Sequence, residues 1–313
     1  MDLEIAAVLN RARRSGAPNL NTLTPPQARA LYRENVRAVA GEPPEVGSVS
    51  GFEIETSATL LNARLYAPLA ARSRRSPLLV YFHGGGWSFG DLDSHDHICR
   101  WLCKESNGFV LSVDYRLAPE HKFPSAVDDA IATVEWAANN ADALGADASK
   151  LSVGGDSAGG NLAAVAALHA RDRGGPALVS QLLIYPATDM SMRSPSHSAF
   201  GDNYRLTRPL MIWSALNYLR DGADILDPRA SPLLAKNHQG LPPAIILTAG
   251  FDPLRDEGEA YAQTLSAAGV RIDYRCYDGA IHGFVGMTGV SRLAREALRF
   301  AGSALHALSS IAD

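Results

Sequence analysis

The sequence predicts an α/β protein built on one mostly parallel central sheet, and three observations support that fold class. First, short apolar runs alternate with helical patterns from about residue 78 onward. Second, runs such as Leu78–Phe82 (LLVYF) and Phe109–Val113 (FVLSV) are apolar throughout, which is typical of strands buried on both faces of a parallel sheet. Third, the helical patterns between the runs are long enough to form the crossovers that join parallel strands.

The strands and helices can be placed along the chain from these patterns. A hairpin and then six further strands are expected, at Phe52–Thr56, Leu60–Tyr66, Leu78–Phe82, Phe109–Val113, Leu151–Val153, Leu182–Tyr185, Ala244–Thr248 and Val270–Tyr277. The helical patterns between and after the strands lie at about 94–106, 124–144, 158–172, 256–268 and 290–308. The last strand is expected at an edge of the sheet, where it could pair with its copy in a homodimer.

Two segments do not fit the alternation of strands and helices. Residues 1–40 carry apolar residues at helical spacing, and the sequence Thr24-Pro25-Pro26-Gln27 (24–27) is a helix start with an N-cap hydroxyl, so two helices outside the main sheet are expected here. Residues 187–241 form a long insert of loop with a helix over Leu210–Leu219. A connection of this length is usually functional, and it is often a lid over a site.

Composition excludes several classes of protein. The chain has 313 residues and a formal charge of −4, and no run of Lys and Arg exceeds two residues, so we expect no nucleic-acid partner. No stretch approaches 18 uninterrupted apolar residues, and the first 20 residues do not resemble a signal peptide. Three cysteines (Cys99, Cys103 and Cys276) are too few for a disulfide framework, so a reduced, cytoplasmic protein is expected.

Residues 155–159 (GDSAG) fit the pattern G-x-S-x-G. A chance match is common, but here the pattern follows an apolar strand and opens an alanine-rich helix, the context in which a nucleophile elbow occurs. There the serine, Ser157, is held at a sharp turn with its hydroxyl exposed. The alternative is a glycine-rich turn between strand and helix that merely contains a serine.

Residues 83–87 (HGGGW) follow the strand at Leu78–Phe82 directly. Attack on an ester creates an oxyanion that needs hydrogen-bond donors already in place, and glycines let backbone N–H groups approach it closely. Gly85 and Gly86 could supply two donors, and Ala158, just after the serine, a third. A phosphate-binding loop is disfavoured because neither of the usual glycine patterns for phosphate is present.

The base and the orienting acid are expected after the nucleophile, in the order acid then base. His282 lies in a loop just after the last predicted strand, which selects it from nine histidines. Asp252 directly follows the strand Ala244–Thr248 and is the best candidate for the acid. Three other carboxylates are rivals for that role: Asp256 and Glu257 on the following helix, and Asp278 nearest to His282 in sequence.

A metal site over His95, His97, Cys99 and Cys103 is a weaker interpretation of another cluster. Residues two apart on a helix point in widely different directions, so the two histidines would not converge on one ion. The start of a helix with two cysteines packed inside explains the same residues. No metal and no cofactor is therefore expected.

Taken together, the motifs resemble those of the bacterial hormone-sensitive-lipase-like esterases, family IV of the α/β-hydrolase fold. The matching stretches are HGGGW at 83–87, DYRLAPEHKFPSAVDD at 114–129, GDSAGG at 155–160, DPLRDE at 252–257 and HGF at 282–284. The resemblance implies a catalytic triad of Ser157, Asp252 and His282. It implies an oxyanion hole from Gly85, Gly86 and Ala158, and a site shaped by His83, Gly84, Trp87 and Asp156.

The resemblance also implies a helical cap, formed by residues 1–45 and 187–225, over a catalytic domain of residues 46–186 and 226–313. Met211, Trp213 and Leu216 of the insert are available to line a cavity. The expected activity is hydrolysis of small esters with short to medium acyl chains. A catalytically silent small-molecule receptor on the same fold, an amidase or lactonase, and a long-chain lipase remain alternatives.

Overall fold

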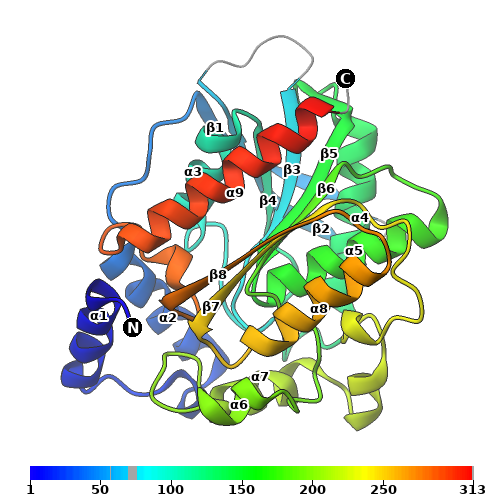
Figure 1. The fold of residues 1–313 in the computed structure, drawn as a ribbon. Helices are drawn as coiled ribbons and strands as arrows, with labels where there is room; N and C mark the ends of the chain where they lie inside the picture. The colour runs from blue at the N-terminus through cyan, green and yellow to red at the C-terminus, as the bar shows by residue number, and fades with distance from the viewer. Residues whose placement is uncertain (57, 70–75, 312–313) are drawn as a thin grey trace.

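The computed structural model describes residues 1–56, 58–69 and 76–311. Within them the chain forms one eight-stranded sheet with the order β1-β2-β4-β3-β5-β6-β7-β8 (Figure 1). The strands are β1 Ser48–Glu55, β2 Leu60–Ala67, β3 Ser76–Phe82, β4 Phe109–Val113, β5 Ala146–Asp156, β6 Ser180–Ile184, β7 Ala244–Phe251 and β8 Ile272–Ile281. Strand β2 pairs antiparallel with β1 and β4, and every other pairing is parallel, so the predicted α/β class is confirmed.

The predicted hairpin and the edge position of the last strand are both confirmed. The edge of β8 is not open along its whole length, because the backbone N–H of Asp2 donates to the carbonyl of Gly279 at 2.9 Å. Strand β5 begins five residues before its predicted start at Leu151. Its first residues are largely polar, and they carry no apolar run that a sequence pattern could detect.

Helices cover both faces of the sheet. Helices α3 (Asp96–Ser106) and α9 (Arg292–Ile311) pack against each other on one face, where α9 crosses the sheet in Figure 1. The opposite face is covered by α4 (Ser125–Asn140), α5 (Ala158–Arg173) and α8 (Arg255–Ala267). Successive side chains of a strand point to opposite faces, so each inner strand contributes to two separate cores.

The alanine-rich sequence of α5 explains why this helix lies so close to the sheet. Nearly all of its side chains are buried, and it contacts β3, β5 and β6. Small side chains let the helix axis approach the strands. Its N-terminus therefore stands directly beyond the carboxyl end of β5.

Further helices lie at the end of the sheet towards which β7 and β8 point (Figure 1). They are α1 Leu3–Ser15, α2 Pro25–Ala40, α6 Pro195–Ala199 and α7 Arg208–Tyr218, with short 3-10 turns at Leu20–Thr22, Gly222–Leu226, Pro232–Leu234 and Phe284–Gly286. The two N-terminal helices and α7 were predicted, and Gln27 does complete the capping box at Thr24. Helix α6 and the 3-10 turns were not predicted, because they are too short to show a periodic pattern.

The two segments outside the alternation touch each other. The turn Leu20–Thr22 packs against α7, and the Arg13 side chain donates to the carbonyl of Asn203 at 2.9 Å. Arg29 of α2 reaches further, donating to the carbonyls of Ser88 and Ala118 near the glycine loop. The N-terminal helices and the insert thus lie together at the carboxyl ends of the strands.

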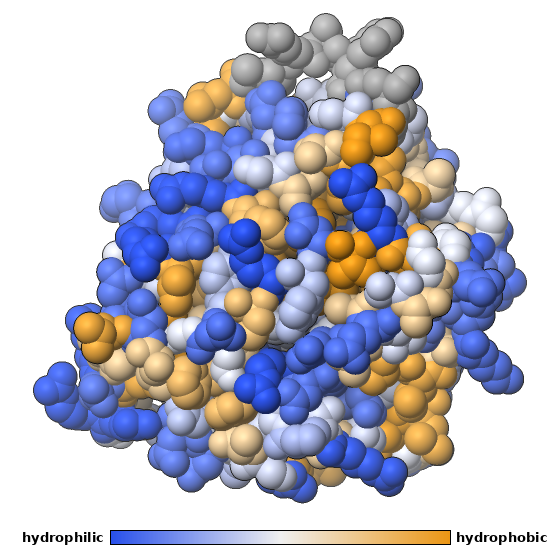
Figure 2. Space-filling model, in the orientation of Figure 1, coloured by the Kyte–Doolittle hydropathy of each residue, from blue (hydrophilic) through white to orange (hydrophobic). Residues whose placement is uncertain are grey.

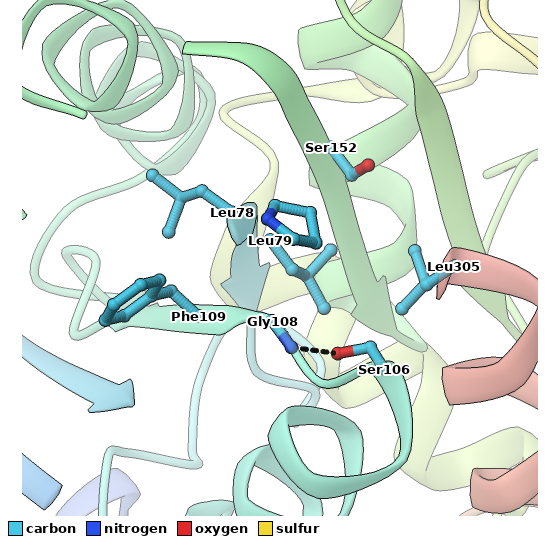
Figure 3. A pocket seen from close by; sticks show the side chains of 8 residues that line it. Leu78, Leu79, Ser106, Gly108, Phe109, Ser152 and Leu305 are labelled. Carbon is cyan, nitrogen blue, oxygen red and sulfur yellow. Dashed lines mark hydrogen bonds between the residues drawn. The ribbon is translucent and has the colours of Figure 1, made fainter. Parts of the chain in front are cut away.

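The face of the molecule seen in Figure 2 carries polar residues interspersed with separate apolar patches. No helix in the described ranges is both long and apolar enough to cross a membrane. All three cysteines are free. A small hollow at the amino ends of β3 and β4 has a volume of about 10 Å³, room for one water at most (Figure 3). It lies at the opposite end of the sheet from the predicted site residues, so it is not a substrate pocket.

Candidate active site

The predicted elbow is a sharp turn between β5 and α5. Ser157 has φ 56° and ψ −116°, a conformation that L-residues rarely adopt and that marks a strained, functional turn. A Cβ on Gly159 would lie 1.9 Å from the carbonyl oxygen of Phe82, and one on Gly155 would lie 2.4 Å from the backbone of Gly159. Only glycine at both positions permits this close crossing of helix and strand.

The structure brings together the serine, histidine and aspartate that the sequence predicts. His282 Nε2 lies 2.9 Å from Ser157 Oγ, and His282 Nδ1 lies 2.8 Å from Asp252 Oδ2. The carboxylate of Asp252 is fully buried, and its other oxygen accepts from the N–H of Leu254 at 2.8 Å. A proton on Nδ1, facing the carboxylate, leaves Nε2 as a lone-pair acceptor that faces the serine hydroxyl.

Two of the three rival carboxylates, Asp256 and Glu257, have other partners. Asp256 accepts from the backbone N–H of Ser196 at 2.8 Å. Glu257 lies 2.7 Å from His197 Nε2, and both side chains are about 1% exposed. Both carboxylates therefore hold the insert against α8, and neither contacts His282.

The glycine loop after β3 lies beside the elbow. Gly84 donates to Asp156 Oδ1 at 2.9 Å, and Gly85 and Gly86 have φ values of 126° and 55°, which favour glycine. Within the described part of the chain, the N–H groups of Gly85, Gly86 and Ala158 donate to no backbone or side-chain acceptor. One free backbone donor, Ala158, therefore lies at the turn that carries Ser157, and two lie in the glycine loop beside it.

Asp156 is the polar centre that fixes this loop. Its Oδ1 accepts from the hydroxyl of Tyr81 at 2.7 Å and lies 3.4 Å from His95 Nε2. Burial alone would raise the pKa of Asp156, but the charge and hydrogen bond of His95, with the donors of Tyr81 and Gly84, lower it to about 2. The carboxylate is therefore ionised at neutral pH and holds Gly84 in place.

His83 and Trp87, the other predicted shaping residues, are buried beside the loop. His83 Nδ1 lies 2.9 Å from the carbonyl of Gly84, and its ring stacks on Tyr115 at 4.3 Å between centroids. Burial lowers the pKa of His83 to about 4, so this ring is neutral at neutral pH and is not a base for the serine. Trp87 stacks on Tyr218, also at 4.3 Å.

The alternative metal cluster does not converge on one point. His95 faces Asp156, whereas His97 Nε2 lies 3.0 Å from the carbonyl of Gly286. Of the three residues proposed to line a cavity from the insert, Met211 is buried and Trp213 is half-buried near Phe89. Leu216 is 72% exposed, so its predicted place in a cavity lining is wrong, because the helix turns that face to solvent.

The sequence analysis missed three residues around the site, two of them beside His282 and Gly283. The Tyr185 ring lies 4.7 Å from the His282 ring, and the Arg205 guanidinium lies next to Gly283. Tyr32 of α2 is close enough for the charge of Arg205 to act on it. Tyr185 ends a predicted strand, which could have indicated it, but no sequence signal points to Tyr32 or Arg205.

The arrangement defines a class of protein. A mostly parallel sheet carries a serine on a strained turn, with a histidine and a buried aspartate from the ends of β8 and β7, and these features are those of an α/β hydrolase.

Comparison with known proteins agrees with this class. A family profile described as alpha/beta hydrolase fold matches residues 79–286. A carboxylic ester hydrolase, LipN, of Mycobacterium tuberculosis is 47% identical over 266 residues, which cover 83% of this chain and 70% of the relative. An ethyl acetate hydrolase of Pseudomonas putida is 38% identical and covers 89% of both chains.

A solved structure is also similar over almost the whole chain. An ester hydrolase from the metagenome of Lake Arreo, solved with a bipyridine phosphonate derivative, superposes with a TM-score of 0.95 at 42% identity, covering 98% of each chain. The chain belongs to the hormone-sensitive-lipase-like family of α/β hydrolases that its motifs resemble.

Proposed function

We propose that this protein is a carboxylesterase that hydrolyses small esters with short to medium acyl chains through an acyl-enzyme on Ser157. The observation that carries the proposal is the hydrogen-bonded series Ser157–His282–Asp252, with donor distances of 2.8 and 2.9 Å. Relatives named as ester hydrolases, 47% and 38% identical, support the reaction class.

In the first step His282 Nε2 takes the proton of Ser157 as its oxygen attacks the ester carbonyl carbon. The negative charge that develops on the carbonyl oxygen is stabilised by the N–H groups of Gly85, Gly86 and Ala158. The imidazolium of His282 is stabilised by Asp252, and it then returns the proton to the departing alcohol. Water, activated by the same imidazole, attacks the acyl-enzyme and releases the acid and the free serine.

Residues 1–45 and 187–225 act as a helical cap in this proposal, and the remaining residues form the catalytic domain. The support is the packing of the turn Leu20–Thr22 on α7 and the bond from Arg13 to Asn203. Ser214 of α7 also lies close to the glycine loop, since a Cβ on Gly86 would be 2.5 Å from its Oγ. A cap over the site limits the length of the acyl chain.

The partner is a small ester, with no nucleic acid, no metal and no other cofactor. Three free cysteines are consistent with a reducing, cytoplasmic location. A homodimer would pair the open part of the β8 edge, over residues 272–277, with its copy. The homodimer can be tested by mixing two differently tagged copies of the protein and asking whether they co-purify.

A fluorophosphonate probe tests the proposed chemistry directly, because it phosphonylates an activated serine and no ordinary one. We expect stoichiometric labelling of Ser157 in the wild-type protein and none in Ser157→Ala. An acyl series of p-nitrophenyl esters, with kcat/KM for each, then measures the chain-length preference. A protein that binds esters without labelling or turnover would be the silent receptor instead.

A further inference from the structure

Arg205 brings an unpaired positive charge to the edge of the proposed active site. It belongs to the insert, and its guanidinium lies beside the residue that follows the catalytic histidine: a Cβ on Gly283 would be 3.4 Å from both Cζ and Nε of Arg205. The backbone of Arg205 has φ 37°, in the left-handed region that non-glycine residues rarely adopt. Residues with strained backbones cluster at functional sites, so the strain at Arg205 suggests a functional role for its side chain.

The guanidinium has no counter-charge in the described ranges. No carboxylate there forms an ion pair with Arg205, no carbonyl accepts a hydrogen bond from it, and no aromatic ring lies beneath it. The residue is nevertheless half-buried. Removing a guanidinium from bulk water without a partner costs free energy, which a bound anion would offset.

The charge of Arg205 acts on the hydroxyls of two tyrosines, Tyr32 and Tyr185. Burial raises the pKa of Tyr32 and of Tyr185 far above the usual value, Asp156 adds to the rise, and the charge of Arg205 opposes it in both. Both hydroxyls therefore keep their protons at neutral pH and can donate. Neither hydroxyl has a hydrogen-bond partner within the described chain. Tyr32 is half-buried and Tyr185 is 1% exposed, so a polar ligand group would satisfy hydroxyls that are otherwise unpaired.

We propose that Arg205, with the hydroxyls of Tyr32 and Tyr185, binds a carboxylate carried by the ester, so that the enzyme favours esters bearing a carboxylate over neutral esters of the same shape. The planar fork of a guanidinium suits a carboxylate, which accepts two parallel hydrogen bonds. Tyr185, at the end of β6, and Arg205, in the insert, lie beside His282 and Gly283. Tyr32 of α2 lies over the glycine loop, with its ring 4.8 Å from that of Phe89. The inference rests on the proposed esterase activity and specifies its substrate class.

The test compares matched charged and neutral substrates within each variant. For a carboxylate on the acyl side, the pair is mono-4-nitrophenyl adipate and 4-nitrophenyl hexanoate; shorter dicarboxylates are avoided because their own carboxylate attacks the ester. For a carboxylate on the alcohol side, the pair is 4-acetoxybenzoate and 4-acetoxybenzamide. The quantity measured is the ratio of kcat/KM for the charged ester to that for its neutral partner, which cancels any loss of folded enzyme.

In Arg205→Met we expect this ratio to fall roughly 10- to 100-fold for at least one pair, because a charge-assisted hydrogen bond is lost. Arg205→Lys should lose less, since the charge stays and only the fork is lost. Arg208, three residues on and exposed at the start of α7, is the matched control. Arg208→Met removes the same charge from the same insert and should leave both ratios unchanged.

The wild-type protein offers a second measurement that needs no variant. Adipate should inhibit hydrolysis of 4-nitrophenyl hexanoate competitively, and more strongly than neutral adipamide. The inference would be overturned if the ratio of charged to neutral kcat/KM were the same in wild type and Arg205→Met for both substrate pairs. It would also be overturned if Arg208→Met lowered this ratio as much as Arg205→Met does. Either result would leave the esterase function intact. Absence of hydrolysis of every neutral ester and of labelling at Ser157 would instead overturn the proposed function.

Discussion

Two regions of the molecule differ in how firmly their side chains are fixed. One is the carboxyl ends of β7 and β8, and the other is the set of helices that lie over them. Asp252 and His282, at the ends of β7 and β8, are at most 8% exposed, and both ring nitrogens of His282 have partners within 2.9 Å. On α7, Ile212 is 41% exposed and Leu216 is 72% exposed, and nearby Arg205 has no partner in the described chain. The sheet therefore fixes the side chains of the triad, and we propose that the segments outside it select which ester reaches the serine.

Several contacts join the two regions, and one group of them is centred on Glu257. Glu257 of α8 accepts from the backbone N–H groups of Thr188 and Asp189 and lies 2.7 Å from His197 Nε2, all three in the insert. Burial raises the pKa of Glu257, and the contact with His197 opposes the rise. The first part of the insert is therefore held against α8, close to the strand end that carries Asp252. Its later part is held by Lys122, whose Nζ donates to the carbonyls of Leu216, Asn217 and Leu219.

The largest effect should come from removing the nucleophile. Ser157→Ala should lower kcat on p-nitrophenyl butyrate by on the order of 10⁴ to 10⁶, with the fold intact by circular dichroism, because the serine forms the acyl-enzyme. His282→Ala should lose a similar amount, and the double variant little more, since the residues act as a unit. Retention of more than about a tenth of wild-type activity in Ser157→Ala would show that another residue is the nucleophile.

A second comparison separates the two carboxylates of the DPLRDE segment. Asp252→Asn should lower kcat by on the order of 10⁴, because an amide no longer holds the required tautomer of His282. Asp256→Asn should cost much less, since Asp256 bonds only to the backbone of Ser196 and to neighbouring Arg255. The measurement is kcat of both variants on one ester. A larger loss of kcat in Asp256→Asn than in Asp252→Asn would contradict the assignment of Asp252 as the acid.

The sequence was informative wherever one local pattern determines structure. Strand β4 has the predicted bounds because Phe109–Val113 is apolar throughout, and the elbow was found because a strand, a glycine pattern and a helix follow one another. The start of β5 was missed because residues 146–150 pair at the sheet without an apolar run. Chain order selected Asp252 and His282, and the structure places these two side chains 2.8 Å apart, because β7 and β8 are parallel neighbours that end at the same edge.

Contacts between distant segments were beyond sequence analysis. Arg205 and Tyr185 lie beside Gly283 and His282 only because the insert packs over the same strand ends. The pairing of His197 with Glu257 joins residues 60 positions apart, and nothing in either local sequence indicates it. Polar residues outside periodic elements often have hydrogen-bond partners that are distant in sequence, so their structural roles can be seen only once the chain is folded.

The glycine loop lies between the strand ends and the helices over them, because it follows β3 and its Gly86 lies close to Ser214 of α7. Gly85→Val should lower kcat by about 10²- to 10³-fold with a smaller change in KM, since an oxyanion donor acts mainly in the transition state. A side chain there cannot be accommodated without movement: its Cβ would lie 2.0 Å from the carbonyl oxygen of Phe89. An unchanged kcat with a much larger KM would mean that the loop binds ground-state substrate instead.

The smallest expected effects concern acyl-chain length, where the helices above the site should decide the outcome. Each methylene that still fits should add about 0.8 kcal/mol, roughly fourfold in kcat/KM, and the first that does not fit should incur a steric cost. We expect kcat/KM to rise from acetyl to a maximum between butanoyl and octanoyl and to fall sharply by dodecanoyl.

Two substitutions on one helix test whether α7 sets that limit. Trp213 is half-buried with its ring 6.3 Å from that of Phe89, next to the glycine loop, so Trp213→Ala should open space and move the maximum to longer chains. Leu216 faces solvent, and Leu216→Ala should leave the profile unchanged. The same p-nitrophenyl series measures both.

A wild-type profile that climbs through palmitoyl esters, with activation at a lipid interface, would mean that no closed acyl pocket exists and that the protein is a lipase. Equal shifts in both variants would instead place the limit elsewhere than on the buried side of α7.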